Sequence, residues 1–247
     1  MEDNKGQHFL LNEDILKEIV KASELRKNDR VLEVGAGSGN LTEHLVKRAS
    51  EVTAFELDKK LGPLLKKKFA SRRNITLIID DALKYYWKNF DKIVSNIPYY
   101  ISEPLIIKAI IADIRSITIV IGEKFKNKLL SHNKIGLIAN SFYEINVIRK
   151  IDRKEFTPQP RVNSFLVTLK KKTKISKIDK IMLDISIGKG KIKNSIIHAL
   201  MKSQMTKREA KSIVAKIDIH DSILEKPALK ITSKLFLRIK SSLEDVL

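Results

Sequence analysis

The chain has 247 residues, of which 43% are hydrophobic, so it can bury the core of one large domain or of a domain with an appendage, and a disordered chain is excluded. Its 48 Lys and Arg against 29 Asp and Glu give a net charge of +19, the balance expected of a protein that binds a polyanion. The absence of cysteine excludes disulfides and thiolate chemistry, and the five scattered histidines lack metal-ligand spacing, so we expect no metal site.

The sequence contains no membrane or export signal. No apolar run approaches the ~20 residues that a transmembrane helix needs, and residues 1–6 are polar where a signal peptide would be apolar. We therefore expect a soluble, cytoplasmic protein without a membrane partner, and we take it to be a monomer. The lysine excess fits either a solvated surface or nucleic-acid binding. Because residues 170–247 hold 19 Lys and Arg against 8 Asp and Glu, the excess is uneven and favours nucleic acid.

The first two thirds of the chain alternate between helical and strand patterns. Asn12, followed by two acidic residues, is typical of a helix N-cap and predicts a helix over about 13–25. Apolar residues at helical spacing predict further helices near 41–49 and 58–70. Short β-branched runs predict strands over 30–34, 51–55, 75–79, 92–95 and 117–121. This alternation predicts a doubly wound α/β fold with a mostly parallel, Rossmann-like sheet.

The remainder of the chain follows a different pattern. After a helix that Ser102-Glu103-Pro104 can open, strand-like runs over 143–151 and 162–169 flank a turn-rich segment at 156–160. From residue 171 onward helical periodicity dominates, and one expected helix face carries Ile192, Ile196, Ile197, Leu200 and Met201. We predict an α/β domain over residues 1–171 and a small, helical, basic domain over residues 172–247.

A glycine-rich turn follows the first predicted strand. The strand runs into Gly35-Ala36-Gly37-Ser38-Gly39-Asn40 and then into a helical pattern. Glycines in such a turn let the backbone pass close to a ligand and place amide groups at a helix N-terminus. A dinucleotide fingerprint requires glycine at the position of Asn40, so the pattern fits an S-adenosylmethionine enzyme better than an NAD oxidoreductase. We expect Gly35 and Gly37 to contact the cofactor.

Carboxylates follow the next two strands. Glu56 ends the second strand, 21 residues after Gly35, where its two oxygens can accept hydrogen bonds from both ribose hydroxyls of a cofactor. Asp81 follows the third strand and can accept the exocyclic amine of the cofactor's adenine. The alternative is that Asp80 or Asp81 caps the next segment.

The segment Asn96-Ile97-Pro98-Tyr99 follows the fourth predicted strand. It resembles the Asn-Ile/Leu-Pro-Tyr motif of the ribosomal RNA adenine dimethyltransferases, which include small-subunit enzymes of the KsgA/Dim type and the Erm enzymes of macrolide resistance. An adenine amine is a poor nucleophile because its lone pair is delocalised into the ring. The Asn96 side-chain oxygen and the Ile97 carbonyl can accept its two hydrogens, Pro98 can fix the loop, and Tyr99 can stack on the extruded base. An ordinary tight turn is the alternative for this segment.

Two further segments resemble the same family. Gly6-Gln7-His8-Phe9-Leu10 is similar to its N-terminal Gly-Gln-Asn-Phe-Leu motif, with His in place of the commoner Asn, and this implies that His8 and Leu10 contact the cofactor. Residues 156–164 are similar to its Phe-x-Pro-x-Pro-x-Val-x-Ser segment, which implies that Phe156 lines the base pocket opposite Tyr99. A position in the hydrophobic core is an equal alternative for Phe156. The resemblance covers nearly the whole chain and implies a class I methyltransferase fold.

The resemblance also implies a function. A member of this family transfers methyl groups from S-adenosylmethionine to the exocyclic amine of adenines in ribosomal RNA, giving dimethyladenine without a metal. Residues 189–200 are similar to a basic stretch of the small-subunit enzymes, which implies 16S-type RNA in the small subunit or its precursor as the partner; residues 120–125 match that branch only loosely. The alternatives are an Erm-type large-subunit enzyme and a non-catalytic RNA-binding assembly or transcription factor on the same fold.

Overall fold

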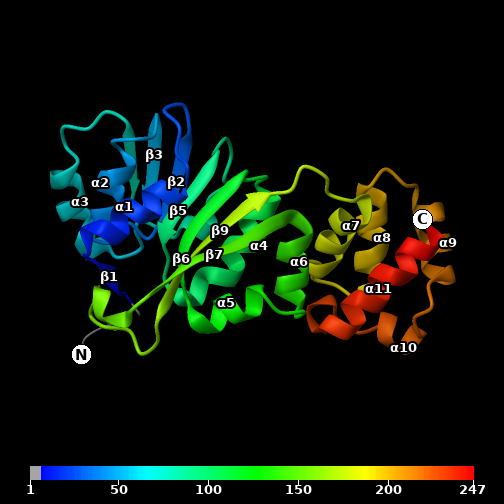
Figure 1. Ribbon diagram of the computed structural model, residues 1–247. Helices are drawn as coiled ribbons and strands as arrows, with labels where there is room; N and C mark the ends of the chain where they lie inside the picture. The colour runs from blue at the N-terminus through cyan, green and yellow to red at the C-terminus, as the bar shows by residue number, and fades with distance from the viewer. Residues whose placement is uncertain (1–6) are drawn as a thin grey trace. The chain divides into compact units, whose positions relative to one another are not determined.

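The computed structural model describes residues 7–247, which divide into two compact units (Figure 1). Unit 1 comprises the described residues up to Asn127 together with Tyr143–Lys171, and unit 2 comprises Lys128–Phe142 together with Lys172–Leu247. The predicted division had left residues 128–142 in the first domain. They belong with unit 2 because helix α6 (Lys134–Phe142) packs against α7 (Lys177–Ser186) and α11 (Ser233–Val246). Within the described chain, every helix is too short or too polar to span a bilayer.

Unit 1 is built on a seven-stranded sheet with the strand order β4-β3-β2-β5-β6-β9-β7. Its strands are β2 (Arg30–Val34), β3 (Glu51–Phe55), β4 (Ile75–Ile78), β5 (Lys92–Asn96), β6 (Ser116–Gly122), β7 (Tyr143–Ile151) and β9 (Ser164–Lys171). Strands β2 to β6 are parallel, and β9 and β7 pair antiparallel to their neighbours, which confirms the predicted fold class. The chain leaves β2 towards β3 and β4 and then returns to β5 on the other side. Such a reversal leaves a crevice for a ligand at the carboxyl ends of the two central strands.

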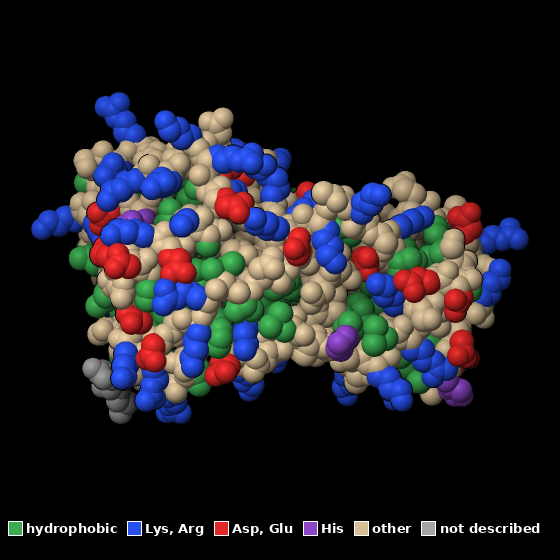
Figure 2. Space-filling model, in the orientation of Figure 1, with side chains coloured by type: hydrophobic (Ala, Val, Ile, Leu, Met, Phe, Trp, Pro, Cys, Tyr) green, Lys and Arg blue, Asp and Glu red, His purple; other side chains and the backbone are tan. Residues whose placement is uncertain are grey.

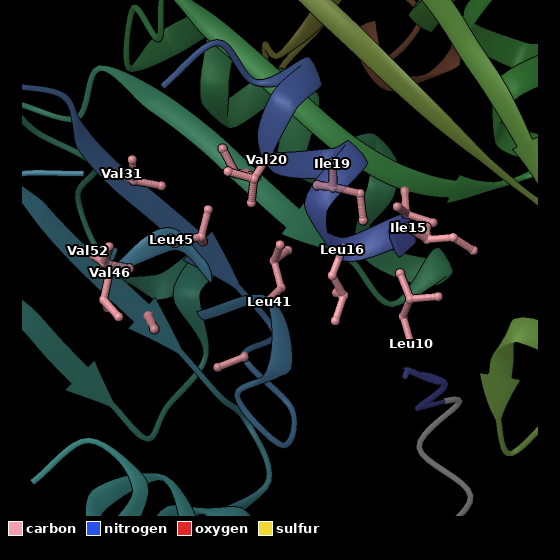
Figure 3. Packing of buried hydrophobic residues seen from close by; sticks show 14 of the residues in the cluster. Leu10, Ile15, Leu16, Ile19, Val20, Val31, Leu41, Leu45, Val46 and Val52 are labelled. Carbon is pink, nitrogen blue, oxygen red and sulfur yellow. The ribbon is translucent and has the colours of Figure 1, made fainter. Parts of the chain in front are cut away.

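Helices cover this sheet and close its core. They are α1 (Glu13–Ala22), α2 (Asn40–Leu45), α3 (Gly62–Lys68), α4 (Ser102–Ile111) and α5 (Glu123–Leu129), with short 3₁₀ turns η1 (Lys59–Leu61), η2 (Ala82–Lys84), η3 (Tyr99–Ile101) and η4 (Arg153–Glu155). The first helix begins where predicted, because Asn12 Oδ1 accepts the backbone N–H groups of Asp14 and Ile15 at 3.0 and 3.3 Å. The apolar face of α1 belongs to a buried cluster that also includes Leu10, Leu41 and Leu45 (Figure 3). Each such side chain contributes roughly 1.5–3 kcal/mol on burial.

A second, two-stranded sheet joins the beginning of the described chain to a segment far along it. Strand β1 (Phe9–Leu10) pairs antiparallel with β8 (Phe156–Thr157). Two bonds flank this pairing: Asn12 Nδ2 donates to Glu155 Oε2 at 2.8 Å, and His8 Nδ1 lies 2.7 Å from the carbonyl oxygen of Pro158. Because a carbonyl only accepts, Nδ1 of His8 carries the proton. The sheet thereby fixes residues 8–10 to the segment 155–158 within unit 1.

Unit 2 is entirely helical in the described residues. It contains α6, α7, α8 (Ile192–Lys202), α9 (Lys207–Lys216), α10 (Asp221–Leu224), the 3₁₀ turn η5 (Ala228–Lys230) and α11. Ile192, Ile196 and Leu200 are fully buried on one face of α8, as predicted. Met201 is 41% exposed, so its predicted place on that face is wrong. Met201 comes one residue after Leu200, and successive helix residues point about 100° apart, so its side chain turns away from the face that Ile192, Ile196 and Leu200 form.

Candidate active site

One cavity opens at the carboxyl ends of the parallel strands of unit 1. Its wall comes from segments far apart in the sequence, namely residues 7–10, 33–38, 55–57, 80–82 and 96–101, with Leu16, Asn40 and Leu41. The first segment is held there by β1, and the others are the loops that leave β2, β3, β4 and β5. The cavity therefore occupies the crevice that the strand order creates.

The glycine turn brings backbone close to the loop after β5. Gly35 and Gly37 have φ angles of +84° and +58°, in the left-handed region where side chains are strained. A Cβ atom at Gly35 would lie 3.3 Å from Cδ of Pro98, so glycine also permits this close approach. Asn40, which replaces the last glycine of a dinucleotide fingerprint, donates from Nδ2 to the carbonyl oxygen of Leu10 at 3.2 Å. The bond from Asn40 therefore holds the segment around Leu10 against the glycine turn.

The Glu56 carboxylate lies buried at the end of β3, with an exposure of 3%. Its Oε2 accepts the backbone N–H of Gly37 at 2.7 Å, and its Oε1 accepts the N–H of Asp58 at 2.8 Å and Nε2 of Gln7 at 3.3 Å. A carboxylate offers about four acceptor positions, so Glu56 retains capacity for a ligand hydroxyl. The bonds to backbone fix its orientation towards the glycine turn.

Asp81 caps the next turn, which was the alternative interpretation, and it also lies in the cavity wall. Its Oδ1 accepts the backbone N–H of Leu83 at 2.9 Å and caps the 3₁₀ turn η2, while the residue also lines the cavity. Asp80 lines the cavity too, and its Oδ1 accepts the N–H of Asp81 at 2.7 Å. A carboxylate with one oxygen used for capping keeps its second oxygen for a ligand amine.

The Asn96 amide is oriented by the N-terminal segment. Asn96 ends β5, and its Nδ2 donates to the carbonyl oxygen of His8 at 3.0 Å. Because that carbonyl only accepts, the NH₂ end of the amide must face it, and Oδ1 remains the group available to a ligand. Ile97, the next residue, is buried, and Pro98 leads into the turn η3. The motif that begins at Asn96 predicted this residue, but nothing in the sequence predicted the His8 carbonyl that orients it.

The Tyr99 ring is held on three sides. Its hydroxyl lies 2.6 Å from Ser164 Oγ, and its ring centroid lies 5.9 Å from that of His8. The ring also packs over Gly122, where an added Cβ would approach Cδ2 of the ring to 3.2 Å. Burial raises the pKa of the Tyr99 hydroxyl above its ordinary value, although the bond to Ser164 lowers it, so the phenol stays neutral. A neutral, fixed aromatic ring suits stacking better than acid–base chemistry.

Two of the predicted site residues have different surroundings. Leu10 lines the cavity. Phe156, which pairs with it across β1 and β8, is only 3% exposed, belongs to the hydrophobic cluster and is absent from the cavity wall. The core position that the sequence left as an alternative is therefore where Phe156 lies, and the pairing of β8 with β1 explains why.

Glu33 is a cavity residue that the sequence analysis missed. It lies inside β2, is 1% exposed, and accepts Thr42 Oγ1 at 2.6 Å. Burial raises the pKa of its carboxyl to about 8, while the bond from Thr42 lowers it and the nearby charge of Glu56 raises it further. An acidic residue between the apolar residues Leu32 and Val34 was the available signal. In the described residues, no cluster of three or more acidic or histidine side chains is arranged to hold a metal.

Comparisons with known proteins show the family to which this chain belongs. The family model "Ribosomal RNA adenine dimethylase" matches residues 2–236. The protein named "Probable ribosomal RNA small subunit methyltransferase A" from Pyrococcus furiosus is 36% identical over 183 residues, which are 72% of this chain and 67% of that protein. The mitochondrial ribosomal RNA small subunit methyltransferase of Arabidopsis thaliana is 35% identical over 67% of this chain and 47% of that protein. The chain thus spans about half to two thirds of the length of these relatives.

Two solved structures share the fold over nearly the whole chain. A dimethyladenosine transferase from Plasmodium falciparum has a TM-score of 0.67 at 24% identity and covers 96% of this chain and 98% of its own. The 23S rRNA methyltransferase ErmE has a TM-score of 0.64 at 23% identity, with 96% and 99% covered. The family model spans both units, and the loops it covers build one cavity from Asn96, Tyr99, Gly35 and Glu56. The chain belongs to the ribosomal RNA adenine dimethylase family of methyltransferases.

Proposed function

We propose that this chain transfers methyl groups from S-adenosylmethionine to the exocyclic amine of adenines in small-subunit ribosomal RNA, giving dimethyladenine. The observation that carries this proposal is the oriented Asn96 amide, whose nitrogen is used by the His8 carbonyl and whose oxygen remains available in the cavity. The names of the curated relatives support the small subunit as the target. Assistance in small-subunit assembly follows from modifying RNA within that particle.

The wall of the cavity fits S-adenosylmethionine, whose sulfonium supplies an electrophilic methyl group when bound. Glu56 would accept a ribose hydroxyl, because its buried carboxylate is already oriented by two backbone N–H groups and retains acceptor capacity. Asp81 would accept the adenine amine through the oxygen that does not cap η2. Gly35, Gly37, His8 and Leu10 would contact the cofactor from the glycine turn and from β1.

The chain's own groups would prepare the target amine. Asn96 Oδ1 and the Ile97 carbonyl oxygen would accept its two hydrogens and leave its lone pair free to form the new N–C bond. Tyr99 would hold the base by stacking, because its ring is immobilised by Ser164 and Gly122. The proton that the methylated nitrogen gives up would pass to solvent, so no strong base is needed. The same arrangement would serve a second transfer to the same amine.

The positive charge of the chain supports RNA as its partner. Lys and Arg side chains spread over the visible face of each unit, with acidic side chains among them (Figure 2). The net charge of the chain is +19, and the wide distribution of its Lys and Arg side chains favours contacts with many phosphates of an RNA backbone. We assign phosphate binding to the helical unit 2 and reception of the extruded adenine to unit 1.

The test compares wild-type protein with Asn96→Ala and with Asn127→Ala, an exposed asparagine outside the cavity. With labelled S-adenosylmethionine, we expect methyl transfer to small-subunit particles that lack the modification. The Asn96 variant should lose roughly a hundredfold or more of this activity, with cofactor affinity near normal by calorimetry, and the Asn127 variant should lose none. Methylation confined to naked large-subunit RNA would indicate an Erm-type enzyme instead. An inactive wild-type protein that still binds the particles would indicate a non-catalytic assembly factor.

A further inference from the structure

Two adjacent tyrosines at the mouth of the cavity have opposite surroundings. Tyr99 is fixed by its hydroxyl bond to Ser164 and by its packing on Gly122. Tyr100 lines the same cavity but is 64% exposed, and among the described residues its side chain makes no hydrogen bond or ring contact. Tyrosine buries a large apolar ring when it binds, and it is common in recognition sites for that reason. The Tyr100 ring is thus an open aromatic surface beside the site that Tyr99 completes.

The turn that carries Tyr100 is held firmly on both sides. The backbone N–H of Ile101 donates to the carbonyl oxygen of Pro98 at 3.1 Å, and Ser102 Oγ donates to the carbonyl oxygen of Tyr99 at 2.8 Å. These bonds close the 3₁₀ turn η3 around the tyrosine pair. A ring on a fixed backbone loses little conformational entropy on binding, since only its own two side-chain torsions remain to be ordered.

The position of Tyr100 separates it from the residues expected to hold the cofactor. Glu56 is almost fully buried and follows β3, whereas Tyr100 follows β5 and is 64% exposed at the solvent edge of the wall. A strand of RNA that inserts one base into the cavity must leave the neighbouring bases outside, and those bases lose stacking when the target is extruded. An aromatic ring at the rim offers them a replacement surface.

From this geometry we propose that Tyr100 positions the RNA by stacking on the nucleobase next to the target adenine. The inference rests on the proposed function and adds a second base to the recognised substrate. Stacking is tolerant of base identity because every base has an aromatic face, so the predicted ligand is a purine or pyrimidine of unpaired RNA flanking the target. Tyr100 is a positioning residue, and Tyr99 holds the base that is modified.

The experiment uses the full chain with Tyr100→Ala, Tyr100→Leu and Tyr100→Phe. Tyr86→Ala is the matched control, because Tyr86 is 81% exposed and lies outside the cavity wall. Methyl transfer to small-subunit RNA is measured as kcat and KM, and S-adenosylmethionine affinity is measured by calorimetry. We expect Ala and Leu at residue 100 to raise the KM for RNA about tenfold, and Phe to keep it near wild type. Cofactor affinity should not change in any variant, and the control should behave as wild type.

A substrate lacking the flanking base completes the test. Once the methylated adenine is mapped by mass spectrometry, RNA with an abasic site beside it should bind wild type and Tyr100→Ala equally, because the stacking partner is gone. An Ala variant with unchanged KM on intact RNA would overturn the stacking proposal while leaving the proposed function standing. Weakened cofactor binding by that variant would also overturn it, because it would identify Tyr100 as a cofactor contact. A wild-type protein that methylates no RNA would refute the proposed function and this inference together.

Discussion

Unit 1 contains a fully buried carboxyl group and unit 2 a partly buried one, and the two affect stability in opposite ways. Glu33 in unit 1 forms one side-chain hydrogen bond, from Thr42, and burial raises its pKa to about 8. Asp179 in unit 2 accepts Ser141 Oγ at 2.8 Å, Ser176 Oγ at 2.7 Å and Lys240 Nζ at 2.7 Å. Burial alone would raise the pKa of Asp179, but these three bonds outweigh it and hold the pKa below its usual value.

Glu33 is a carboxyl group that lines a cavity, whereas Asp179 is a carboxylate that holds helices together. Glu33 lines the cavity and keeps acceptor capacity there, so its burial lowers stability once it is ionised. Asp179 joins α6, the N-cap of α7 and α11, so it fastens the segment 128–142 to the rest of unit 2. Ionisation of Glu33 is therefore expected to lower stability, and the ionised Asp179 to raise it.

The largest change in the free energy of unfolding is expected for Glu33→Gln. A carboxyl whose pKa is raised on folding stabilises the protein fully below its unfolded pKa of about 4.5, and this contribution is lost as the pH rises towards 8. Glutamine does not titrate, so the variant should gain about 3 kcal/mol relative to wild type between pH 5 and pH 8. Urea unfolding at several pH values measures the difference.

A surface carboxyl supplies the control for that experiment. Bonds from Lys47 and Lys68 lower the pKa of Glu43, so Glu43→Gln should differ from wild type by a constant amount across the same range. A Glu33→Gln difference that is equally flat would show that Glu33 is ionised throughout, and the contrast with Asp179 would fail.

Asp179→Ala should have a smaller effect, of opposite sign. Removing the carboxylate leaves Lys240, whose side chain is partly exposed, without its partner, and it frees Ser141 and Ser176. We expect a loss of about 2 kcal/mol after allowance for solvent screening. Because the folded pKa of Asp179 is lowered, its contribution is present above pH 4 and is lost only as the pH falls through that lower value.

Measurement of the Asp179 effect needs a comparison on the same unit. Asp245→Ala, an exposed residue on α11, should leave the free energy of unfolding unchanged. The penalty at Asp179 should be constant from pH 5 to pH 8, where the Glu33 difference grows. Equal unfolding free energies for the Asp179 and Asp245 variants would mean that the bonds to Asp179 contribute nothing.

The same two units differ in how much their sequence predicted. In unit 1 the strands of the seven-stranded sheet were predicted within one or two residues, because buried parallel strands such as β2 and β5 are short runs between turn signals. The motif residues Gly35 and Asn96 were also predicted, since each follows a strand that ends at the same edge. In unit 2 the helical character was predicted, but α6 was missed because its nine residues run directly into the strand pattern of β7.

What the sequence could not predict depends on pairing between distant segments. The two-residue strands β1 and β8 have no periodicity of their own, yet their pairing puts Phe156 in the core and the His8 carbonyl beside Asn96. Glu33 was overlooked because it reads as part of a strand, and only the fold shows that this strand ends inside a cavity. Motif order therefore predicts which loops meet, and tertiary pairing decides how their side chains are oriented.

Gly122→Ala tests the smallest of these orienting effects. A methyl group at residue 122 would stand 3.2 Å from Cδ2 of Tyr99, so the ring must shift by a few tenths of an ångström while its hydroxyl stays tied to Ser164. A misaligned ring should lower kcat for methyl transfer about fivefold, equivalent to about 1 kcal/mol, with cofactor affinity and unfolding free energy nearly unchanged. Asn127→Ala is the control, because Asn127 is exposed and lies outside the cavity wall. If the two variants transfer methyl groups equally fast, the position of Tyr99 is less restricted than its packing on Gly122 implies.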